Sequence, residues 1–402
     1  MSNASEAIDG VSVKGWFSLT SSALTAVVVG FASTILLIME AADAAGANDA
    51  EKASFAAALC FGMAVTSVIL GWRYRMPIIT AWSTPGAALI ATSAGAGLDY
   101  PSAIGAFIAA GVLMCVTALF KPVARLIEKI PASIAAAMLA GVLLRYTMGV
   151  PGAAIELPYL VMPLIVVFFV LRVWLPLFAV PVVVVLGVVL ATFTGAFGAG
   201  CCTLSMTQPV WTTPSFNWPV IVGLGLPLYL VTMASQNLPG FAVLKASGYQ
   251  PPVTGSLWVT GLGSIAFAPF GSHQLNLAAI TASIVTGPDS HPDPAKRWLV
   301  VWPYAVFYIL IGLAAASFVA ILGSLPKPLI VAIAGLALFA PLLGSTTAMF
   351  KEKNEIEAAL ATFLVSASGI TIYGVGAPFW GLVVGLVLYG ARYYQSMRKP
   401  HG

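Results

Sequence analysis

Long runs of apolar residues, separated by short polar stretches, occupy most of the chain. A helix that crosses a bilayer needs about 20 mostly apolar residues, and most of the runs approach that length. The pattern therefore predicts an all-α polytopic membrane protein with about fourteen transmembrane segments. The predicted segments are 17–42, 53–71, 76–96, 101–119, 131–149, 157–174, 176–196, 217–242, 253–268, 269–287, 298–320, 325–345, 355–371 and 375–395.

Charged residues are rare in this chain: 8% of the 402 residues are Asp, Glu, Lys or Arg, and 59% are hydrophobic. A soluble domain carries about 25% charged residues, so the composition excludes a soluble enzyme. The residues before Phe17 lack the charged, apolar and small-residue regions of a cleaved signal peptide. The first apolar run is therefore expected to remain in the protein as a helix.

The positions of lysine and arginine predict an orientation, because these residues collect on the cytoplasmic side of membrane proteins. With the N-terminus inside, only Lys52, Arg145 and Lys327 fall on the outer side, and both termini are cytoplasmic. A smaller even number of segments stays open if two short ones do not cross fully. The basic residues on the predicted inner side are Lys14, Arg73, Arg75, Lys121, Arg125, Lys129, Arg172, Lys245, Lys296, Arg297, Lys351, Lys353, Arg392, Arg398 and Lys399.

The net charge of +4 is explained by this orientation signal, since no basic stripe interleaved with aromatic residues indicates nucleic-acid binding. The four cysteines show no metal-ligand spacing. No G-x-x-x-x-G-K-[ST] phosphate loop is present. The sequence therefore predicts no metal, no cofactor and no direct use of ATP. The expected partners are membrane lipid and a small solute.

Two pairs of similar segments indicate an internal repeat. IPASIAAAMLAGVLL, from Ile130, resembles LPKPLIVAIAGLALF, from Leu325, and each follows a polar segment interrupted by Pro and Gly. Two halves of seven segments have opposite orientations, and inverted repeats of this kind are common in secondary transporters. We predict repeats at 1–196 and 217–402, joined by an extracytoplasmic linker at 197–216.

The two interrupted segments, MPIITAWSTPGAALIATSAG and APFGSHQLNLAAITASIVTG, are the strongest candidates for a site. A break in a transmembrane helix is tolerated only where protein or a water-filled cavity satisfies the exposed backbone groups. In each, an extended run (77–81 or 267–270) is expected to precede a polar cluster and a short helix. Two helix N-termini would then meet and favour an anion or a carboxylate. The candidate residues are Trp82, Ser83 and Thr84, and Phe270, Gly271, Ser272, His273, Gln274 and Asn276.

A third polar group, Ser235, Gln236 and Asn237, interrupts the eighth segment, where amides cost desolvation unless they find partners. His273 is a candidate proton carrier, because imidazole changes charge near neutral pH and ionisable groups inside membranes often mark ion pathways. Glu40, in the first segment, is the other candidate. The alternatives are a neutral His273 bound to a carbonyl, a Glu40 at the aqueous boundary, and hydroxyl groups that only mediate helix packing.

Three strings at these positions resemble the benzoate transporter family of bacterial inner membranes, the BenE-type proton symporters. They are ITAWSTPGAALI at 79–90, SQNLPGFAVLKASGY at 235–249 and PFGSHQLNLAAITA at 269–282, and the resemblance runs through essentially the whole chain. More distantly, the layout is similar to the uracil-permease type of fold. That resemblance implies a core domain of segments 1–4 and 8–11, a gate domain of segments 5–7 and 12–14, and short strands with half-helices in segments 3 and 10.

The nucleobase relatives of that fold hold their substrate between the same segments, with glutamates in the eighth and tenth. This chain departs from them, because it offers Ser235 or Gln236 and Ser272 or His273 at those places. The missing acids disfavour a nucleobase, which needs acceptors for its ring N–H groups. They suit a substrate that brings its own carboxylate.

The resemblance implies uptake of benzoate or a close aromatic carboxylate with protons, by movement of the core against the gate. Trp82 and Phe270 would contact the ring, and hydroxyl and amide groups would bind the carboxylate. An uncoupled anion channel or exchanger, or a nucleobase transporter, of the same fold stays open. An enzyme would need a cluster of acids, histidines or metal ligands that the sequence does not show. The apolar gate segments suit a subunit interface as well as lipid, which leaves a homodimer open.

Overall fold

The computed structural model describes residues 11–93, 98–120, 131–176, 178–196, 205–278, 280–372 and 375–398. These residues are mostly helical, as predicted. The elements of the first half are α2 (Val13–Ala44), α3 (Asp49–Tyr74), β1 (Thr80–Trp82), α4 (Thr84–Thr92), α5 (Tyr100–Leu119), α7 (Ala132–Thr147), α8 (Gly149–Glu156), α9 (Pro158–Trp174) and α10 (Ala179–Phe193).

The second half of the described chain is divided into more and shorter pieces. Its elements are α11 (Trp218–Val220), η1 (Ile221–Gly225), α12 (Leu226–Thr232), η2 (Met233–Asn237), α13 (Leu238–Ala246), α14 (Val253–Phe267), η3 (Ala268–Phe270), β2 (Leu275–Leu277), α15 (Ile280–Thr286), η4 (Pro294–Val300), α16 (Val301–Leu313), α17 (Ala315–Gly323), α18 (Lys327–Ala337), α19 (Phe339–Met349), η5 (Lys353–Glu355), α20 (Ile356–Ser368), β3 (Thr371–Ile372), β4 (Val375–Gly376) and α21 (Ala377–Arg398).

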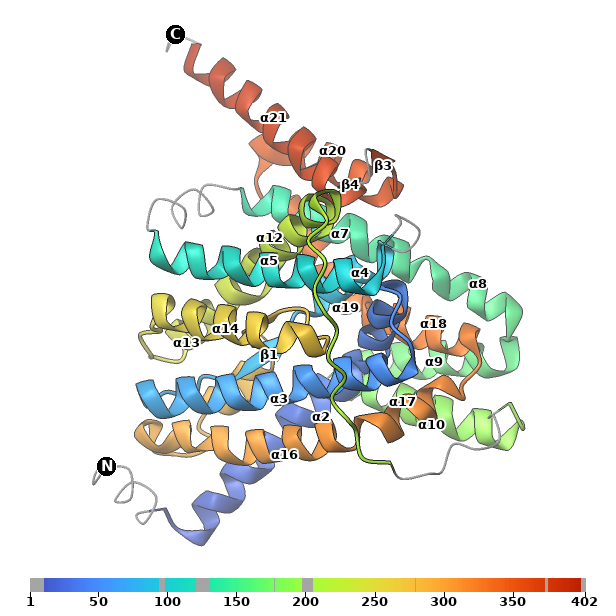
Figure 1. The fold of residues 1–402 in the computed structure, drawn as a ribbon, viewed down its shortest axis with the longest axis vertical. Coiled ribbons are helices and arrows are strands. Elements are labelled where there is room, and N and C mark those ends of the chain that lie inside the picture. The colour runs from blue at the N-terminus through green and yellow to red at the C-terminus, as the bar shows by residue number, and fades with distance from the viewer. Residues whose placement is uncertain are drawn as a thin grey trace.

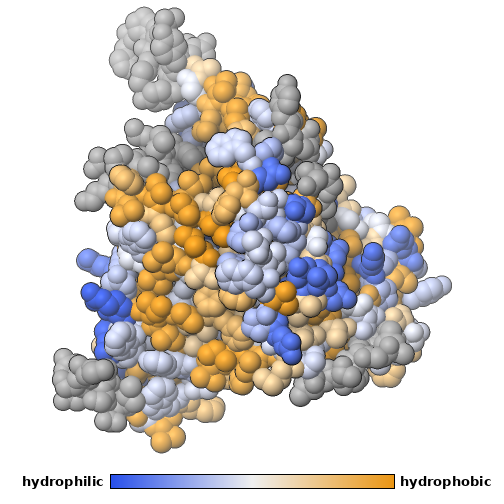
Figure 2. Space-filling view, in the orientation of Figure 1, coloured by the Kyte–Doolittle hydropathy of each residue, from blue (hydrophilic) through white to orange (hydrophobic). Residues whose placement is uncertain are grey.

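Each predicted segment overlaps helical structure. Within the described ranges, six helices are long and apolar enough to cross a membrane, or up to eight if each of two bent pairs is one crossing. Figure 2 shows a broad apolar surface on one face of the molecule, with hydrophilic residues gathered at its edges. The chain is therefore a polytopic membrane protein whose crossings include bent and broken helices.

Helices α5, α14, α3 and α16 lie side by side in that order as a stack of roughly parallel rods (Figure 1). Glycines allow this close packing, which is typical of membrane helices. A Cβ on Gly71 of α3 would lie 2.4 Å from Val301 of α16, and a Cβ on Gly261 of α14 would lie 3.1 Å from the carbonyl of Gly111 on α5. We call α2–α5 and α11–α17 the core group.

Helices α7–α10 and α18–α21 form a second set, which we call the gate group. Within it α7 packs against α19 and α20, α8 against α18, and α9 against α10. The separate helix α8 was not predicted. It begins at Gly149, after a break at Met148, and extends over a stretch that the segment limits had left as a connection.

A strap formed by residues 205–217 runs in extended form across the core group (Figure 1). Residues 197–204 of the predicted linker lie outside the described residues. Backbone N–H groups along the strap donate at 2.8–2.9 Å to acceptors on four parts of the core group: Thr207 to Leu313, Val210 to the hydroxyl of Ser54, Thr212 to Pro269 and Ser215 to Pro101. The strap therefore holds the ends of these core elements together.

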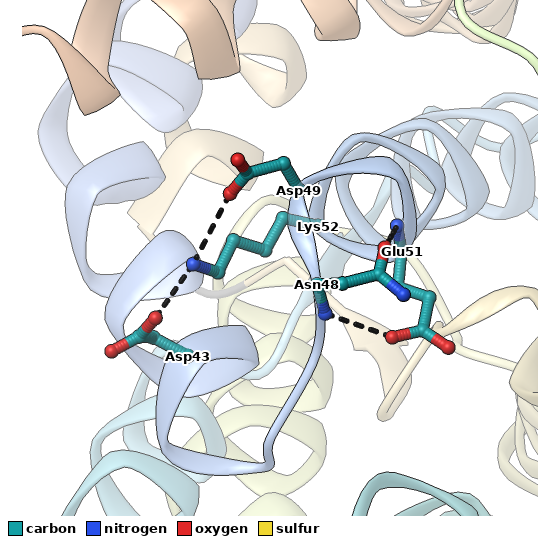
Figure 3. A network of polar contacts seen from close by, with 5 residues as sticks. All are labelled: Asp43, Asn48, Asp49, Glu51 and Lys52. Carbon is teal, nitrogen blue, oxygen red and sulfur yellow. Dashed lines mark hydrogen bonds and ion pairs between the residues drawn. The ribbon is translucent and has the colours of Figure 1, made fainter.

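Lys52, one of the basic residues predicted outside, lies in a polar network at the turn between α2 and α3 (Figure 3). Its ammonium group is 2.6 Å from Asp43 and 3.5 Å from Asp49. Asn48 and Glu51 form a capping box at the start of α3, an arrangement that satisfies two backbone N–H groups. The network thus fixes the sharp turn between the two helices.

Candidate functional site

The two broken segments cross near the middle of the molecule as a pair of antiparallel strands (Figure 1). β1 comes from the first half of the sequence and β2 from the second, with Ala81 opposite Asn276. Segments related by an inverted repeat are expected to run in opposite directions. The structure therefore confirms short strands with half-helices in both segments.

The order of elements in the second broken segment differs from the prediction. Residues 267–270 are not extended: they are the end of α14 and a turn of 3-10 helix, and the strand begins only at Leu275. Gly271 makes the turn between them with a φ of 109°, which glycine adopts without strain. The polar residues 272–274 thus precede the strand, and α15 begins after it, at Ile280.

Side chains of α3 and α16 hold the backbone of β1. The Thr80 N–H donates to the Ser67 hydroxyl at 2.9 Å, and the Tyr304 hydroxyl donates to the Thr80 carbonyl at 2.8 Å. The Thr80 hydroxyl lies 2.7 Å from that of Thr66. Because all these residues are buried, both backbone groups of Thr80 have partners inside the protein, as a helix break in a membrane requires.

Side chains of α14 and the eighth segment hold β2 in the same way. The Leu275 N–H donates to the Ser264 hydroxyl at 2.8 Å, and the Leu277 N–H donates to the amide oxygen of Asn237 at 3.0 Å. The Asn237 amide nitrogen contacts the sulfur of Met233 at 3.4 Å. These partners explain why the strand lies at 275–277, because one side chain of α14 and one of the eighth segment fix its position.

The start of α4 is built from both broken segments. Ser83 is its N-cap: the hydroxyl accepts the Gly86 N–H at 3.1 Å and the Thr232 hydroxyl at 2.9 Å. The Ser83 N–H donates to the Gln274 carbonyl at 3.2 Å. It also lies 2.9 Å from the amide oxygen of Asn276, when that amide is oriented so that both its ends have partners. Ser83 and Asn276 are therefore occupied within the protein.

A cavity of about 950 Å³ lies between the core group and the gate group, beside β1 and α4. The gate side, from α7, α9, α10, α18, α19 and α21, is mainly apolar. The polar residues of its core side, among the described residues, are Thr34, Thr84, Ser235, Gln236, Thr281 and Tyr308. Thr84 is the first residue of α4, so one half-helix N-terminus faces the cavity. α15 begins after its polar cluster, at Ile280, and Thr281 in its first turn lines the same cavity.

Trp82 forms an aromatic wall of this cavity together with Tyr308. The two rings are edge to face at 6.3 Å between centroids. The ring of Phe31 also packs against Trp82, at 5.9 Å between centroids. The indole N–H donates to the Thr34 hydroxyl at 2.9 Å. The hydrogen bond fixes the ring and leaves its apolar surface for packing.

Ser235 and Gln236 reach the cavity from a wide turn, η2, in the eighth segment. Pro239 follows this turn, and a proline inside a helix removes one hydrogen bond and crowds the preceding turn. Wide turns of this kind frequently occur at functional sites. The turn divides the polar group, because Ser235 and Gln236 line the cavity whereas Asn237 binds β2.

Ser272, His273 and Gln274 are fully buried and are not among the described residues that line the cavity. The His273 ring lies edge to face with Phe55 and Phe107, at 5.7 and 6.3 Å. Its Nδ1 accepts the Gln274 N–H at 2.5 Å, so this ring nitrogen binds a backbone N–H and not a carbonyl. Three buried side-chain atoms have no hydrogen-bond partner: the Ser272 hydroxyl, His273 Nε2 and the amide oxygen of the Gln274 side chain.

Three further candidates lie apart from the cavity lining. Phe270 packs edge to face on Trp211 of the strap, at 5.4 Å between centroids. A Cβ on Gly271 would lie 2.6 Å from the Tyr100 hydroxyl, which explains the glycine. Glu40 is half-buried near the end of α2. In the described ranges no three His, Cys, Asp or Glu residues are grouped as a metal site would require.

Comparison with known proteins identifies the family. Residues 17–391 match the model of a family described as "Benzoate membrane transport protein". The chain belongs to the benzoate membrane transport family. It is 32% identical to the benzoate membrane transport protein of Acinetobacter baylyi, over 92% of this chain and 94% of that one. It is 39% identical to the inner membrane protein YdcO of Escherichia coli, over 90% of this chain and 93% of that one. The protein is therefore a membrane transporter and not an enzyme.

This chain shares its fold with solved structures of distant transporters. The transmembrane domain of the cyanobacterial bicarbonate transporter BicA matches with a TM-score of 0.58 and 14% identity, covering 94% of this chain and 98% of that one. Murine Slc26a9, an anion transporter in the inward-facing state, matches with a TM-score of 0.59 and 14% identity, covering 93% of this chain and 68% of that one. The predicted two-repeat transporter fold is thereby confirmed.

Several residues that line the cavity of this protein were not predicted from the sequence. Thr34 and Tyr308 lie inside apolar runs that were predicted only as segments. Tyr304 and Tyr308, four residues apart on α16, gave the one available signal, since such a pair shares a helix face. Phe168 and Arg172 on α9 also line the cavity, and no such aromatic pair pointed to them.

Proposed function

We propose that the protein imports benzoate or a close aromatic carboxylate together with protons. The observation that carries this proposal is the cavity between the core and gate groups, which combines an aromatic wall, Trp82 and Tyr308, with the polar side chains of Ser235 and Gln236. The name of the Acinetobacter baylyi relative supports the substrate class. An aromatic acid has one apolar and one charged end. The aromatic wall offers a partner for the first, and the polar side chains of the cavity offer partners for the second.

The candidate residues divide into two sets in this proposal. Trp82, Thr84, Ser235 and Gln236 contact the substrate, because they line the cavity. The others are not among the described residues that line the cavity and are packed or hydrogen-bonded within the core group; they are Ser83, Asn237, Phe270, Gly271, Ser272, His273, Gln274 and Asn276. No carboxylate is found among the described cavity-lining residues. An anion meets no repulsion there, whereas the ring N–H groups of a nucleobase would lack a charged acceptor.

Transport follows from movement of the core group, with its strand crossing, relative to the gate group. The proposed repeats are 1–196 and 217–402, in a bacterial inner membrane with both termini cytoplasmic; a homodimer is a further proposal. Entry of an anion against an inside-negative potential costs about 2.3 kcal/mol per charge per 100 mV, which a co-transported proton offsets. His273, whose Nε2 has no partner, and Glu40 are the proposed proton carriers.

The test is uptake of radiolabelled benzoate into proteoliposomes with and without an inward proton gradient, competed by uracil and by bicarbonate. Accumulation that requires the gradient and is unaffected by both competitors is expected. The double variant Ser235→Ala, Gln236→Ala should raise KM, and Ser368→Ala, an exposed serine in the gate group, should not. Absence of benzoate uptake, with uracil or bicarbonate moving instead, would overturn the substrate assignment.

A second candidate is uncoupled transport of an anion by the same cavity. The shared fold with a bicarbonate transporter and with an anion transporter supports this alternative. Benzoate flux that follows only its own concentration difference, with no response to the imposed proton gradient, would favour it over symport.

A further inference from the structure

Arg172 is the only charged residue among the described residues that line the cavity. It lies in the last turn of α9, in the gate group, and is half-buried. A basic residue in the last turn favours the helix dipole, and its predicted inner location fits the orientation signal. Both roles need only a positive charge at this end of the helix. Neither requires that the side chain line the cavity.

The Arg172 guanidinium group is held by an aromatic ring of the gate group. It lies 5.2 Å from the centroid of Phe339, within the range of a cation–π contact. Among the described residues, no carboxylate forms an ion pair with it; the ion pairs of that part of the chain involve Lys52 and Arg392. The described cavity lining therefore carries a net positive charge, which raises the local concentration of anions.

Phe168 lies one helical turn before Arg172 and also lines the cavity. Its ring contacts Phe339 edge to face at 6.1 Å, so both side chains are packed against the same residue. Positions i and i+4 of a helix are neighbours, with about 5–6 Å between their Cβ atoms. The gate side of the cavity thus presents an aromatic ring and a guanidinium group next to each other.

We propose that Phe168 and Arg172 form a gate-side subsite for an aromatic carboxylate, with the ring packed on Phe168 and the carboxylate bound by the guanidinium group. The planar fork of arginine matches a carboxylate with two parallel hydrogen bonds. The inference deepens the proposed function and rests on it. The core side contributes neutral polar groups from Ser235 and Gln236, so the gate side supplies the discrimination for charge.

The test measures the affinity of the purified full-length protein for benzoate and for benzamide, its uncharged analogue. Arg172→Gln is expected to weaken benzoate binding by about tenfold or more, as for the loss of a charge-assisted hydrogen bond, with little change for benzamide. Arg172→Lys should recover part of the loss, because it keeps the charge without the fork. Phe168→Leu should weaken both ligands. Arg392→Gln, which removes an exposed arginine of the gate group, is the matched control.

A second measurement uses the wild-type protein and does not depend on the folding of a variant. Phenylglyoxal modifies accessible arginines, and mass spectrometry of the peptides reports each site. Benzoate should protect Arg172 and leave Arg392 unprotected. Benzoate binding by the wild type with no protection of Arg172, or an unchanged benzoate-to-benzamide affinity ratio in Arg172→Gln, would overturn the subsite. A wild type that binds no benzoate would refute the proposed function instead.

Discussion

Replacement of Asn237 by alanine tests whether this residue binds the substrate or holds the strand β2 in place. The Asn237 amide oxygen accepts the Leu277 N–H at 3.0 Å, and its side chain is fully buried. Alanine would leave that N–H without a partner, which costs about 1–3 kcal/mol of stability. We therefore expect Asn237→Ala to lower the midpoint of thermal unfolding of the detergent-solubilised protein, followed by tryptophan fluorescence.

The response of this variant to benzoate tests the assignment directly. A ligand at 100 times its Kd stabilises the folded state by about 2.7 kcal/mol. If Asn237 only holds β2, that stabilisation should be the same in Asn237→Ala and in the wild type, when benzoate is supplied at the same multiple of each Kd. Asn217→Ala, at an exposed asparagine with no capping hydrogen bond, should leave the midpoint unchanged.

The reasoning would be refuted by the opposite pattern. An unchanged unfolding midpoint in Asn237→Ala, together with loss of benzoate binding, would mean that the amide faces the substrate. The strand would then be held by its pairing with β1 and by Ser264 alone.

Three further predictions concern the strap, the proton and the outer turn. Gly105→Val should loosen the strap and speed its proteolysis, because even a Cβ at Gly105 would lie 2.1 Å from the Ser215 carbonyl oxygen. Of the variants His273→Gln and Glu40→Gln, the one that removes the proton carrier should lose gradient-driven uptake in proteoliposomes while it retains benzoate binding at constant pH. Lys52→Ala should lower the unfolding midpoint only slightly, since ion pairs with exposed carboxylates contribute less than about 1 kcal/mol.

Each of these predictions has a contrary outcome. Gly152→Val is the control for the strap, because nothing lies within 4 Å of a Cβ there; equal proteolysis of the two valine variants would contradict the strap contact. Gradient-driven uptake retained by both the His273 and Glu40 variants would remove both as proton carriers. A large loss of stability in Lys52→Ala would show that the network of Figure 3 is stronger than its exposure suggests.

The helical segments could be predicted because membrane helices need long apolar runs, and these are visible in a single sequence. The first strand and half-helix were also accessible, since proline and serine at positions 83–85 provide a recognisable helix start at the predicted place. The second strand was misplaced by a few residues. Its position depends on Ser264 and Asn237, which are brought to it only by the fold.

The site could be predicted on its core side and not on its gate side. Polar residues such as Ser235 and Gln236 are conspicuous inside an apolar segment, and the structure places them on the cavity. Phe168 is one apolar residue among many, and Arg172 had already been explained by the orientation signal. Which face of α9 meets the cavity is decided by packing between distant helices, and the sequence carries no local signal for it.

The strap gives an external reporter of the transport movement. Backbone and side-chain hydrogen bonds join the strap to core elements, so a label on the strap must move as those elements move. Met206 on the strap and Ile155 on α8 are both highly exposed, at 74% and 83%. Dyes at these two positions, one on each group, would read the core-to-gate displacement as a change in energy transfer, with no label near the substrate.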